Sequence, residues 1–400
     1  MSGKRLVVSA ILICLSSLAC SQATFVRPAY ETQTGIAGTD ARLHAKSLIL
    51  FIGDGMGPEI VSIAKVYSEK ALQAPLNMVE FANTGRAGLA STYSNNKLVT
   101  DSAAGATALS TGTKTNNGKV GTAPDGAELK NLLERAVSKG KSVGVITTTT
   151  ITDATPASFL SHVAIRANEV DIAAQIVEGD ATVVMGGGKA YFLPSDGGKR
   201  TDSRDLVAEA KAKGFDVVFD KAGLDAFAGK RLIGLFADED MPYDGERRAY
   251  ETPSLTEMFD KALRTLTADP DGFVLVVEGG RIDHAEHENL LGTALGELLA
   301  LDAALSHAME YQQSDSTLTI VVTADHDTGA PALTSTNAGY PSIDDVANIT
   351  GEDYGYLKWI SEGHTGTMVP IFARGPGQDL FAGIKDNTDT NRAMVMVLGL

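Results

Sequence analysis

The sequence predicts an α/β protein built on a large, mostly parallel central β-sheet with helices on both faces. Short, continuous apolar runs recur along the chain and alternate with amphipathic segments of helical period. The apolar runs end in polar or glycine-rich turns, as the buried strands of a parallel sheet do. Strands that alternate with helices are joined by crossovers, and these crossovers place the helices on the two faces of the sheet.

Composition indicates a soluble globular protein with many turns. Of 400 residues, 44% are hydrophobic, 21% are charged and 41 are glycines, so the chain can bury a sizeable core. The formal net charge of −16 argues against a nucleic-acid partner, because general nucleic-acid binding needs a basic surface. It does not exclude a local positive site made by bound cations.

The N-terminal residues 1–23 are typical of a signal peptide. Two basic residues precede an apolar run over 6–19, which is shorter than the ~20 residues that a membrane span needs. The small residues that end at Ala23 offer a cleavage site. The alternative is a lipid anchor at Cys20, since the residues before it partly resemble a lipobox. We expect an exported protein that is periplasmic or secreted, or that is membrane-anchored as a lipoprotein.

The remaining chain shows no internal boundary. Residues 24–46 are polar without a clear period, and we expect an N-terminal arm there. Residues 47–400 contain no convincing linker and are expected to form a single domain. Both cysteines, Cys14 and Cys20, belong to the leader. A metal site elsewhere in the chain must therefore use Asp, Glu and His.

The first strand is expected over 47–52, where a continuous apolar run ends in a glycine-rich turn, 53–57. The turn places Asp54 at the carboxyl end of a buried strand, between glycines that allow close approach. A helix is expected over 58–70. The glycines do not fit the dinucleotide-binding pattern, and Asp54 would repel a pyrophosphate unless a metal stood between them.

Ser102 stands where the chain turns into small residues of good helix propensity, 103–108. We expect it at the mouth of a helix, where free backbone N–H groups and the helix dipole favour negative charge. A hydroxyl there could be held as an alkoxide or accept a phosphoryl group. The alternative is a serine that only caps an alanine-rich helix. The small residues leave the serine open to a ligand.

The alternation continues through the rest of the chain. A strand over 141–146 continues through threonines to Thr150, and a helix is expected over 157–163, with Arg166 just beyond it. The turn between them contains Asp153 and Thr155 and is, taken alone, a common cap. Further strands are expected over 180–185, 215–219, 232–236, 273–277, 317–322 and 368–373, and further helices over 255–266, 289–311 and 394–400.

Acidic and histidine residues cluster at the predicted strand ends. They are Asp54, Asp153, Glu278, Asp283, His287, Asp325, His326 and His364. Because ligands bind beyond the carboxyl ends of strands in open α/β sheets, we expect these residues to meet at one edge. Five carboxylates there cannot stay ionised together without cations. Mixed carboxylate and imidazole ligands suit zinc, and carboxylates with a threonine hydroxyl suit magnesium.

The sequence resembles the alkaline phosphatase family from about Ser47 to the C-terminus. The resemblance is carried by Gly53–Gly57, Asp101–Thr107, Asp153–Pro156, Glu278–His287, Ala324–His326 and Glu362–Gly366, in the order of the family. It implies a three-layer α/β/α fold and a metal-dependent hydrolase. The implied reaction is hydrolysis of phosphate monoesters to alcohol and inorganic phosphate through a phosphoserine on Ser102, assisted by two Zn²⁺ and one Mg²⁺.

The resemblance also implies a role for each matching residue. The first zinc would be held by Asp283, His287 and His364, the second by Asp54, Asp325 and His326, and the magnesium by Asp54, Asp153, Thr155 and Glu278. Ser102 would complete the second zinc site when deprotonated. Arg166 would bind two phosphate oxygens, oriented by Asp101. His284 lies beside the ligands, where some relatives carry Lys and others His.

Two other functions are compatible with parts of this pattern. A phosphodiesterase or sulfatase would share the metal scaffold, but Arg166 and the residues of the third metal favour monoesters. A catalytically silent phosphate-binding or adhesion protein would not need Ser102 with every expected ligand. The family resemblance also implies a homodimer.

Overall fold

The computed structural model describes residues 43–337, 339–351 and 354–400. The expected signal peptide, Cys20 and almost all of the N-terminal arm lie outside the described residues. The described residues belong to one compact unit, 41–400. Within them, no helix combines the length and the hydrophobicity that a membrane span requires.

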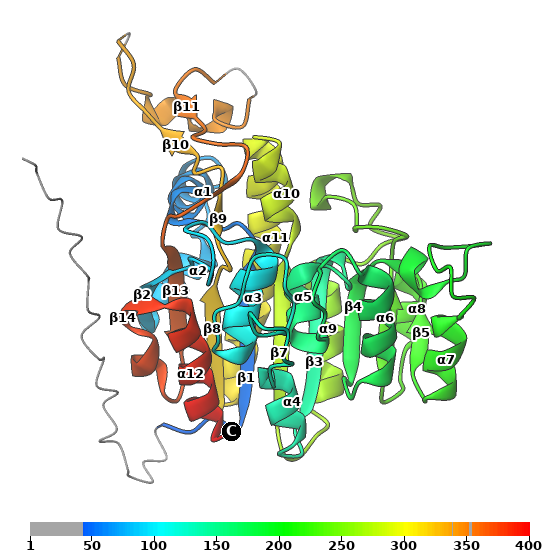
Figure 1. The fold of residues 1–400 in the computed structure, drawn as a ribbon. Coiled ribbons are helices and arrows are strands. Elements are labelled where there is room, and N and C mark those ends of the chain that lie inside the picture. Colours follow the sequence, from blue (N-terminus) through cyan, green and yellow to red (C-terminus); the bar gives the residue numbers. More distant parts are fainter. Residues whose placement is uncertain (1–42, 338, 352–353) are drawn as a thin grey trace, which may run out of the picture. The chain divides into compact units, whose positions relative to one another are not determined.

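Ten strands of the described chain form one central sheet (Figure 1), in the order β14-β2-β13-β8-β1-β7-β3-β4-β6-β5. Their bounds are β1 (Ser47–Gly53), β2 (Arg86–Ser91), β3 (Ser142–Thr150), β4 (Val183–Gly187), β5 (Asp216–Val218), β6 (Leu232–Leu235), β7 (Phe273–Gly279), β8 (Leu318–Thr323), β13 (Val369–Arg374) and β14 (Gly383–Asp386). Strand β13 runs antiparallel to both its neighbours, β8 and β2, and the other pairs are parallel. The mostly parallel sheet predicted from the sequence is confirmed.

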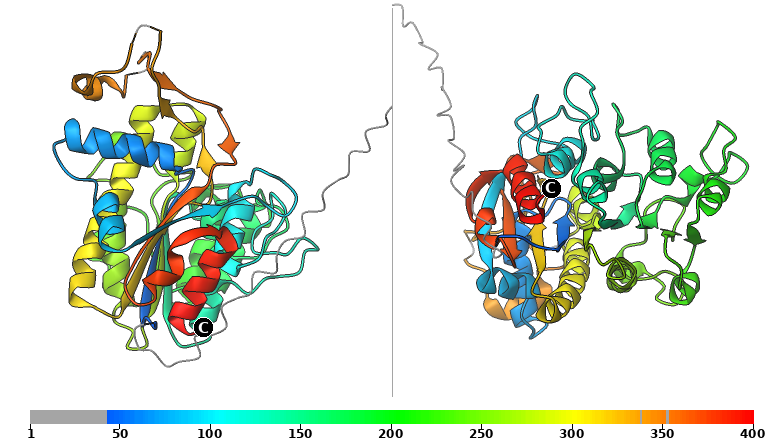
Figure 2. Two further views of the ribbon diagram at one scale, coloured as in Figure 1. Left: turned by 90° about the vertical axis from the view of Figure 1, so that its left-hand side faces the viewer. Right: turned by 90° about the horizontal axis from the view of Figure 1, so that it is seen from below.

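Helices cover both faces of the sheet (Figure 2). Their bounds are α1 (Pro58–Lys70), α2 (Asn77–Thr84), α3 (Ser102–Thr111), α4 (Leu132–Val137), α5 (Ala154–Leu160), α6 (Glu169–Glu178), α7 (Leu206–Ala212), α8 (Lys221–Ala226), α9 (Leu255–Leu266), α10 (Arg281–His287), α11 (Leu291–Ser314) and α12 (Asn387–Leu398). Helices α1, α2, α9 and α11 pack on one face, and α3, α4, α5 and α12 pack on the other. The sheet is therefore the middle of three layers.

The register of the central strands places the polar residues at one level. Ile52 of β1 is paired with Glu278 of β7 on one side and with Thr323 of β8 on the other. Glu278 is paired in turn with Thr147 of β3. The parallel strands β1, β7 and β8 are buried along their whole length, and all three end at this common edge. Asp54 and Asp325 follow within two residues of it.

Some boundaries differ from those expected. The helix placed at 157–163 begins at Ala154, because Asp153 caps it through the Ala154 N–H, and it ends at Leu160. The last helix begins at Asn387 rather than 394, where Asp386 forms a capping box. Strand β2 was not expected, because its side chains are mostly exposed or half-buried and form no apolar run.

Two short antiparallel ladders lie beyond the sheet. Strand β9 (Asp327–Thr328) pairs with β12 (His364–Thr365), so that His364 lies opposite Thr328. Strand β10 (Ala332–Leu333) pairs with β11 (Leu357–Lys358). The first ladder brings the segment after β8 beside the segment before β13, although more than thirty residues separate them in sequence.

Candidate active site

Ser102 is the first residue of α3, as expected for a serine at the mouth of a helix. The cap is Asp101 rather than Ser102, since Asp101 Oδ1 accepts a hydrogen bond from the Ala104 N–H at 3.0 Å. Asp101 Oδ2 accepts another from the Gly118 N–H at 2.8 Å. Ser102 is therefore free of a capping role, and its hydroxyl lies where the backbone N–H groups of the first turn favour an anion.

The serine hydroxyl faces an imidazole rather than solvent. Ser102 is 3% exposed, whereas the small residues of α3 predicted an open side chain. Its Oγ lies 3.1 Å from His326 Nε2. The His326 ring is fully buried and stacks on the His364 ring with 3.6 Å between centroids. The serine is therefore held against the same group of side chains that the strand ends supply.

The first cluster of possible ligands surrounds His326 Nε2. Asp54 Oδ1 lies 3.4 Å from this nitrogen and Asp325 Oδ2 lies 3.3 Å from it. Neither carboxylate oxygen has a hydrogen-bond partner among the described residues. Ligands of a tetrahedral metal with bonds of ~2.1 Å stand ~3.4 Å apart, so these spacings fit a zinc ion.

The second cluster consists of Asp283, His287 and His364. His287 Nδ1 is 2.6 Å from the Glu362 carbonyl and His364 Nδ1 is 2.9 Å from the Thr100 carbonyl. A carbonyl can only accept, so each Nδ1 carries a hydrogen, and each ring presents a lone pair at Nε2 when it is neutral.

These two Nε2 atoms face each other at 3.1 Å, and the Asp283 carboxylate lies 3.3 Å from His287 Nε2 and 3.7 Å from His364 Nε2. Acceptors so close together need a shared positive charge, and mixed imidazole and carboxylate ligands are those that zinc prefers. The three side chains, like the trio of Asp54, Asp283 and His326, are close enough to hold one metal ion.

The pKa values of the site reflect the same need for positive charge. Burial, aided by Asp325 and Asp283, raises the pKa of Asp54 well above its usual range. Burial also raises the pKa of Asp325 to about 7. Although burial opposes it, the hydrogen bond with His287 and the nearby imidazoles lower the pKa of Asp283. The hydrogen bond with Asp283 raises the pKa of His287 to about 9.

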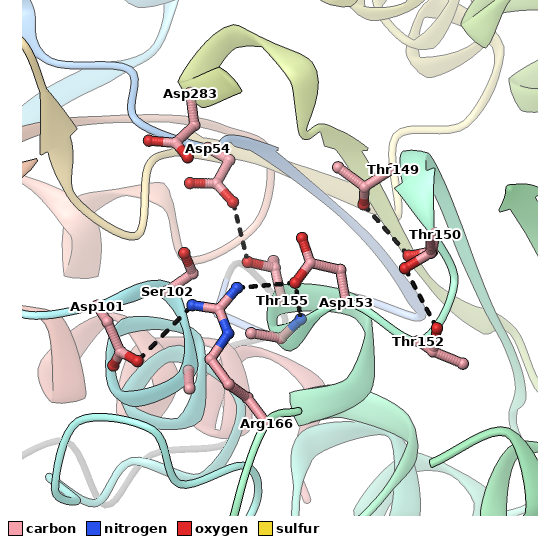
Figure 3. Close-up of polar contacts among 12 residues, drawn as sticks. Asp54, Asp101, Ser102, Thr149, Thr150, Thr152, Asp153, Thr155, Arg166 and Asp283 are labelled. Atoms are coloured by element: carbon pink, nitrogen blue, oxygen red, sulfur yellow. Dashed lines mark hydrogen bonds and ion pairs between the residues drawn. The ribbon is translucent and has the colours of Figure 1, made fainter. Parts of the chain in front are cut away.

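A third cluster contains only oxygen atoms. Thr155 Oγ1 lies 3.5 Å from Asp54 Oδ2, which extends the first cluster towards α5 (Figure 3). Glu278 accepts hydrogen bonds from Thr147 and Thr149, and its buried Oε1 has no partner in the described part of the chain. Burial raises the pKa of Glu278 to about 8. Carboxylates with a hydroxyl are the ligands that magnesium prefers.

Arg166 lies between two carboxylates beside Ser102 (Figure 3). Its Nη2 is 2.8 Å from Asp153 Oδ1, and its Nη1 is 3.7 Å from Asp101 Oδ2. Asp153 is thus the nearer partner, whereas the family resemblance implied that Asp101 orients Arg166. The two carboxylates raise the pKa of Arg166, although burial opposes them. The guanidinium stays charged and is about one-third exposed, so it can bind an anion.

Some contacts of the site were not predicted. His284 Nδ1 lies 3.5 Å from Asp240 Oδ2, and Asp240 is anchored by the Thr150 N–H at 2.9 Å. Thr328 contacts Asp283 and His326. Asp240 gave no signal, because it lies in a polar stretch without a pattern. Thr328 lies two residues after the predicted ligand His326, which was the one available signal.

Comparisons with known proteins identify the family of this chain and relatives with a similar fold. Residues 45–352 match the alkaline phosphatase family. The repressible alkaline phosphatase of Saccharomyces cerevisiae is 35% identical over 84% of this chain, and the match spans 65% of that relative, slightly less than two thirds of its length. Alkaline phosphatase 3 of Bacillus subtilis is 31% identical over 96% of this chain and 95% of its own. The crystal structure of Thermus thermophilus alkaline phosphatase superposes with a TM-score of 0.82 at 30% identity, covering 90% of this chain and 92% of that one.

Proposed function

The chain belongs to the alkaline phosphatase family of phosphoric monoester hydrolases, and we propose that it hydrolyses phosphate monoesters through a phosphoserine on Ser102. One observation carries the proposal. Ser102 Oγ, His326 Nε2 and the unpartnered oxygens of Asp54 and Asp325 converge at the N-terminus of α3, beside the Arg166 guanidinium.

We propose that two Zn²⁺ and one Mg²⁺ complete the site. The residues fit these ions by donor type: imidazole with carboxylate at the first two clusters, and oxygen alone at the third. Asp283, His287 and His364 would hold one zinc, Asp54, Asp325 and His326 the other, and Asp54, Asp153, Thr155 and Glu278 the magnesium. Bound zinc would supply Lewis-acid stabilisation of the attacking and leaving oxygens.

The residues of the chain then have distinct tasks. Ser102 loses its proton, and its Oγ forms a bond to phosphorus as the bond from phosphorus to the alcohol oxygen breaks. The alcohol leaves with a proton. Water then cleaves the phosphoserine, which releases inorganic phosphate and restores the hydroxyl. Arg166 and the N–H groups of α3 bind the non-bridging oxygens in both steps, where negative charge must be stabilised.

A substrate comparison with a Ser102→Ala variant tests the proposal. We expect the wild-type chain to hydrolyse nitrophenyl phosphate faster than the corresponding diester, and to incorporate ³²P from labelled phosphate. Ser102→Ala should lose the label, while metal analysis still finds zinc. Faster diester turnover would instead favour the phosphodiesterase reading. Absence of both label and zinc in the wild type would favour a silent binding protein.

We further propose export through the N-terminal leader and assembly as a homodimer. Export is supported by the basic residues and the apolar run at the start of the chain. Mass spectrometry of the N-terminus of the exported protein should give either residue 24 or a lipid-modified Cys20. Sedimentation equilibrium should give twice the mass of the chain.

A further inference from the structure

Thr328 occupies a central position between the two expected zinc positions. It lies in β9, is fully buried, and is the register partner of His364 in β12. Its backbone N–H donates to the carbonyl of Gly55 at 2.9 Å, beside Asp54. The backbone of Thr328 is thus paired with the segment of His364 and with the segment of Asp54. With the backbone fixed in this way, each rotamer of the side chain brings the hydroxyl to one set of partners.

The Thr328 hydroxyl contacts one ligand of each expected zinc. Its Oγ1 forms a short hydrogen bond with Asp283 Oδ1 and lies 3.2 Å from His326 Nδ1. A hydroxyl has one hydrogen and two lone pairs, and a carboxylate that ligates a metal has no hydrogen to donate. The hydroxyl hydrogen therefore points at Asp283. Oγ1 is then left to accept from His326, so His326 carries its hydrogen on Nδ1.

We propose that Thr328 is a positioning residue that ties the two zinc positions together. Through Asp283 it holds a ligand of the first position, and through His326 it holds a ligand of the second. It also fixes the His326 tautomer whose Nε2 lone pair faces Asp54, Asp325 and Ser102. The inference rests on the proposed function, because it assigns Asp283 and His326 as metal ligands.

The other two imidazoles support this reading. His287 and His364 are each fixed by a backbone carbonyl at Nδ1, and a carbonyl can impose only one tautomer. His326 has the Thr328 side chain in the equivalent place. A side chain that touches both ligands can couple them, whereas each carbonyl contacts one ring. Partners of this kind typically change metal affinity or activity by about 10- to 100-fold when they are removed.

Three variants of the full chain test the inference. Thr328→Val keeps the branched shape and removes the hydroxyl, whereas Thr328→Ser keeps the hydroxyl. Thr365→Val is the matched control, because the Thr365 hydroxyl lies on the same ladder but donates to Asp327, which is not an assigned ligand. Each metal-free protein is titrated with Zn²⁺ against a chromophoric chelator, and its fold is checked by circular dichroism.

We expect Thr328→Val to weaken both zinc-binding steps by about 10- to 100-fold, and Thr328→Ser to restore them to within about threefold. Thr365→Val should stay within about threefold of the wild type. The pH profile of kcat/KM should also change with Thr328→Val and return with Thr328→Ser.

Wild-type zinc affinity in Thr328→Val, weakening of one step alone, or equal loss in Thr365→Val would overturn the inference while leaving the proposed function intact. Failure of Thr328→Ser to restore affinity would do the same. A wild-type chain that binds no zinc would overturn the proposed function and this inference together.

Discussion

Arg166 is held by two carboxylates that belong to different parts of the site. Asp101 caps the serine helix, and Asp153 caps α5 beside the oxygen-only cluster. The guanidinium therefore depends on the correct placement of both helices. Its planar fork suits two oxygens of a phosphate, which a lysine ammonium cannot match.

Replacement of Arg166 by Ala should weaken phosphate binding more than it slows turnover. A charge-assisted hydrogen bond contributes about 1.5–3 kcal/mol, which corresponds to a rise of roughly 10- to 100-fold in the inhibition constant of inorganic phosphate. Arg166→Lys should lie between the wild type and Arg166→Ala. Competitive inhibition of nitrophenyl phosphate hydrolysis measures the constant, and an unchanged constant with a lowered kcat would contradict the assigned role.

The place of a single site residue could be predicted where a side chain that can bind a metal stands at the end of an apolar run. Asp54, Asp325 and His326 stand at the ends of apolar runs, and the structure brings them together as expected. The pairing of Arg166 with Asp153 could not be predicted, because it depends on the conformation of the loop that carries Arg166 and on the direction of its side chain. The burial of Ser102 could not be predicted either, because it depends on tertiary packing, including the contact of its hydroxyl with His326.

Helix α11 contains a glycine in its interior, where glycine lowers the stability of a helix. Gly296 lies in its interior, where glycine is unfavourable because it gives up more backbone freedom than alanine on folding. A Cβ built at Gly296 meets no atom of the described residues within 4 Å, whereas one at Gly292 approaches the Thr350 side chain at 3.3 Å. Packing of the remaining apolar side chains compensates for the unfavourable glycine.

Gly296→Ala should therefore stabilise the protein by about 0.5–1 kcal/mol and raise Tm by about 1–3 °C, without a change in activity. Gly292→Ala is the matched control and should give a smaller gain or none, because Thr350 must move. Calorimetry of both variants measures the difference. Equal stabilisation by the two variants, or destabilisation by Gly296→Ala, would show that the space around the new Cβ does not determine the change in stability.

Elements were predictable where hydrophobic burial dominates. Strands β1, β7 and β8 are buried throughout, so each appears in the sequence as a continuous apolar run. Strand β14 carries exposed or half-buried residues at the sheet edge and leaves no such pattern. The sequence predicted the start of α5 at residue 157, whereas the helix capped by Asp153 already begins at Ala154 and has Thr155 and Pro156 in its first turn.

At the scale of the whole molecule, the parallel core concentrates negative charge at one edge. The same register that buries β1 between β7 and β8 brings Asp54, Glu278 and Asp325 to a common level. The antiparallel direction of β13 could not be predicted from the period of its residues, since both directions produce the same apolar run. A fold of this kind stores electrostatic repulsion that bound cations would relieve.

The stability of the metal-free protein should accordingly fall as pH rises, while that of the metal-loaded protein should not. Burial raises the pKa of Asp325 to about 7 and that of Glu278 to about 8, and it raises that of Asp54 well above the usual range. A carboxyl whose pKa is higher in the folded state destabilises that state once pH exceeds its unfolded pKa of ~4. The loss grows until pH passes the folded pKa.

His287 acts in the same direction, because its raised pKa of about 9 stabilises the folded state at low pH and loses that effect as pH rises through 9. Asp283, whose pKa is lowered, stabilises the folded state fully across this pH window and adds no pH dependence to the stability.

Bound cations require deprotonated ligands, so the stabilisation that the cations provide grows with pH. The Tm difference between chelated and metal-loaded protein should therefore widen between pH 5 and 9 by calorimetry, and Asp325→Asn should flatten the slope of the chelated form. A constant difference would mean that these carboxylates are not the source of the metal dependence.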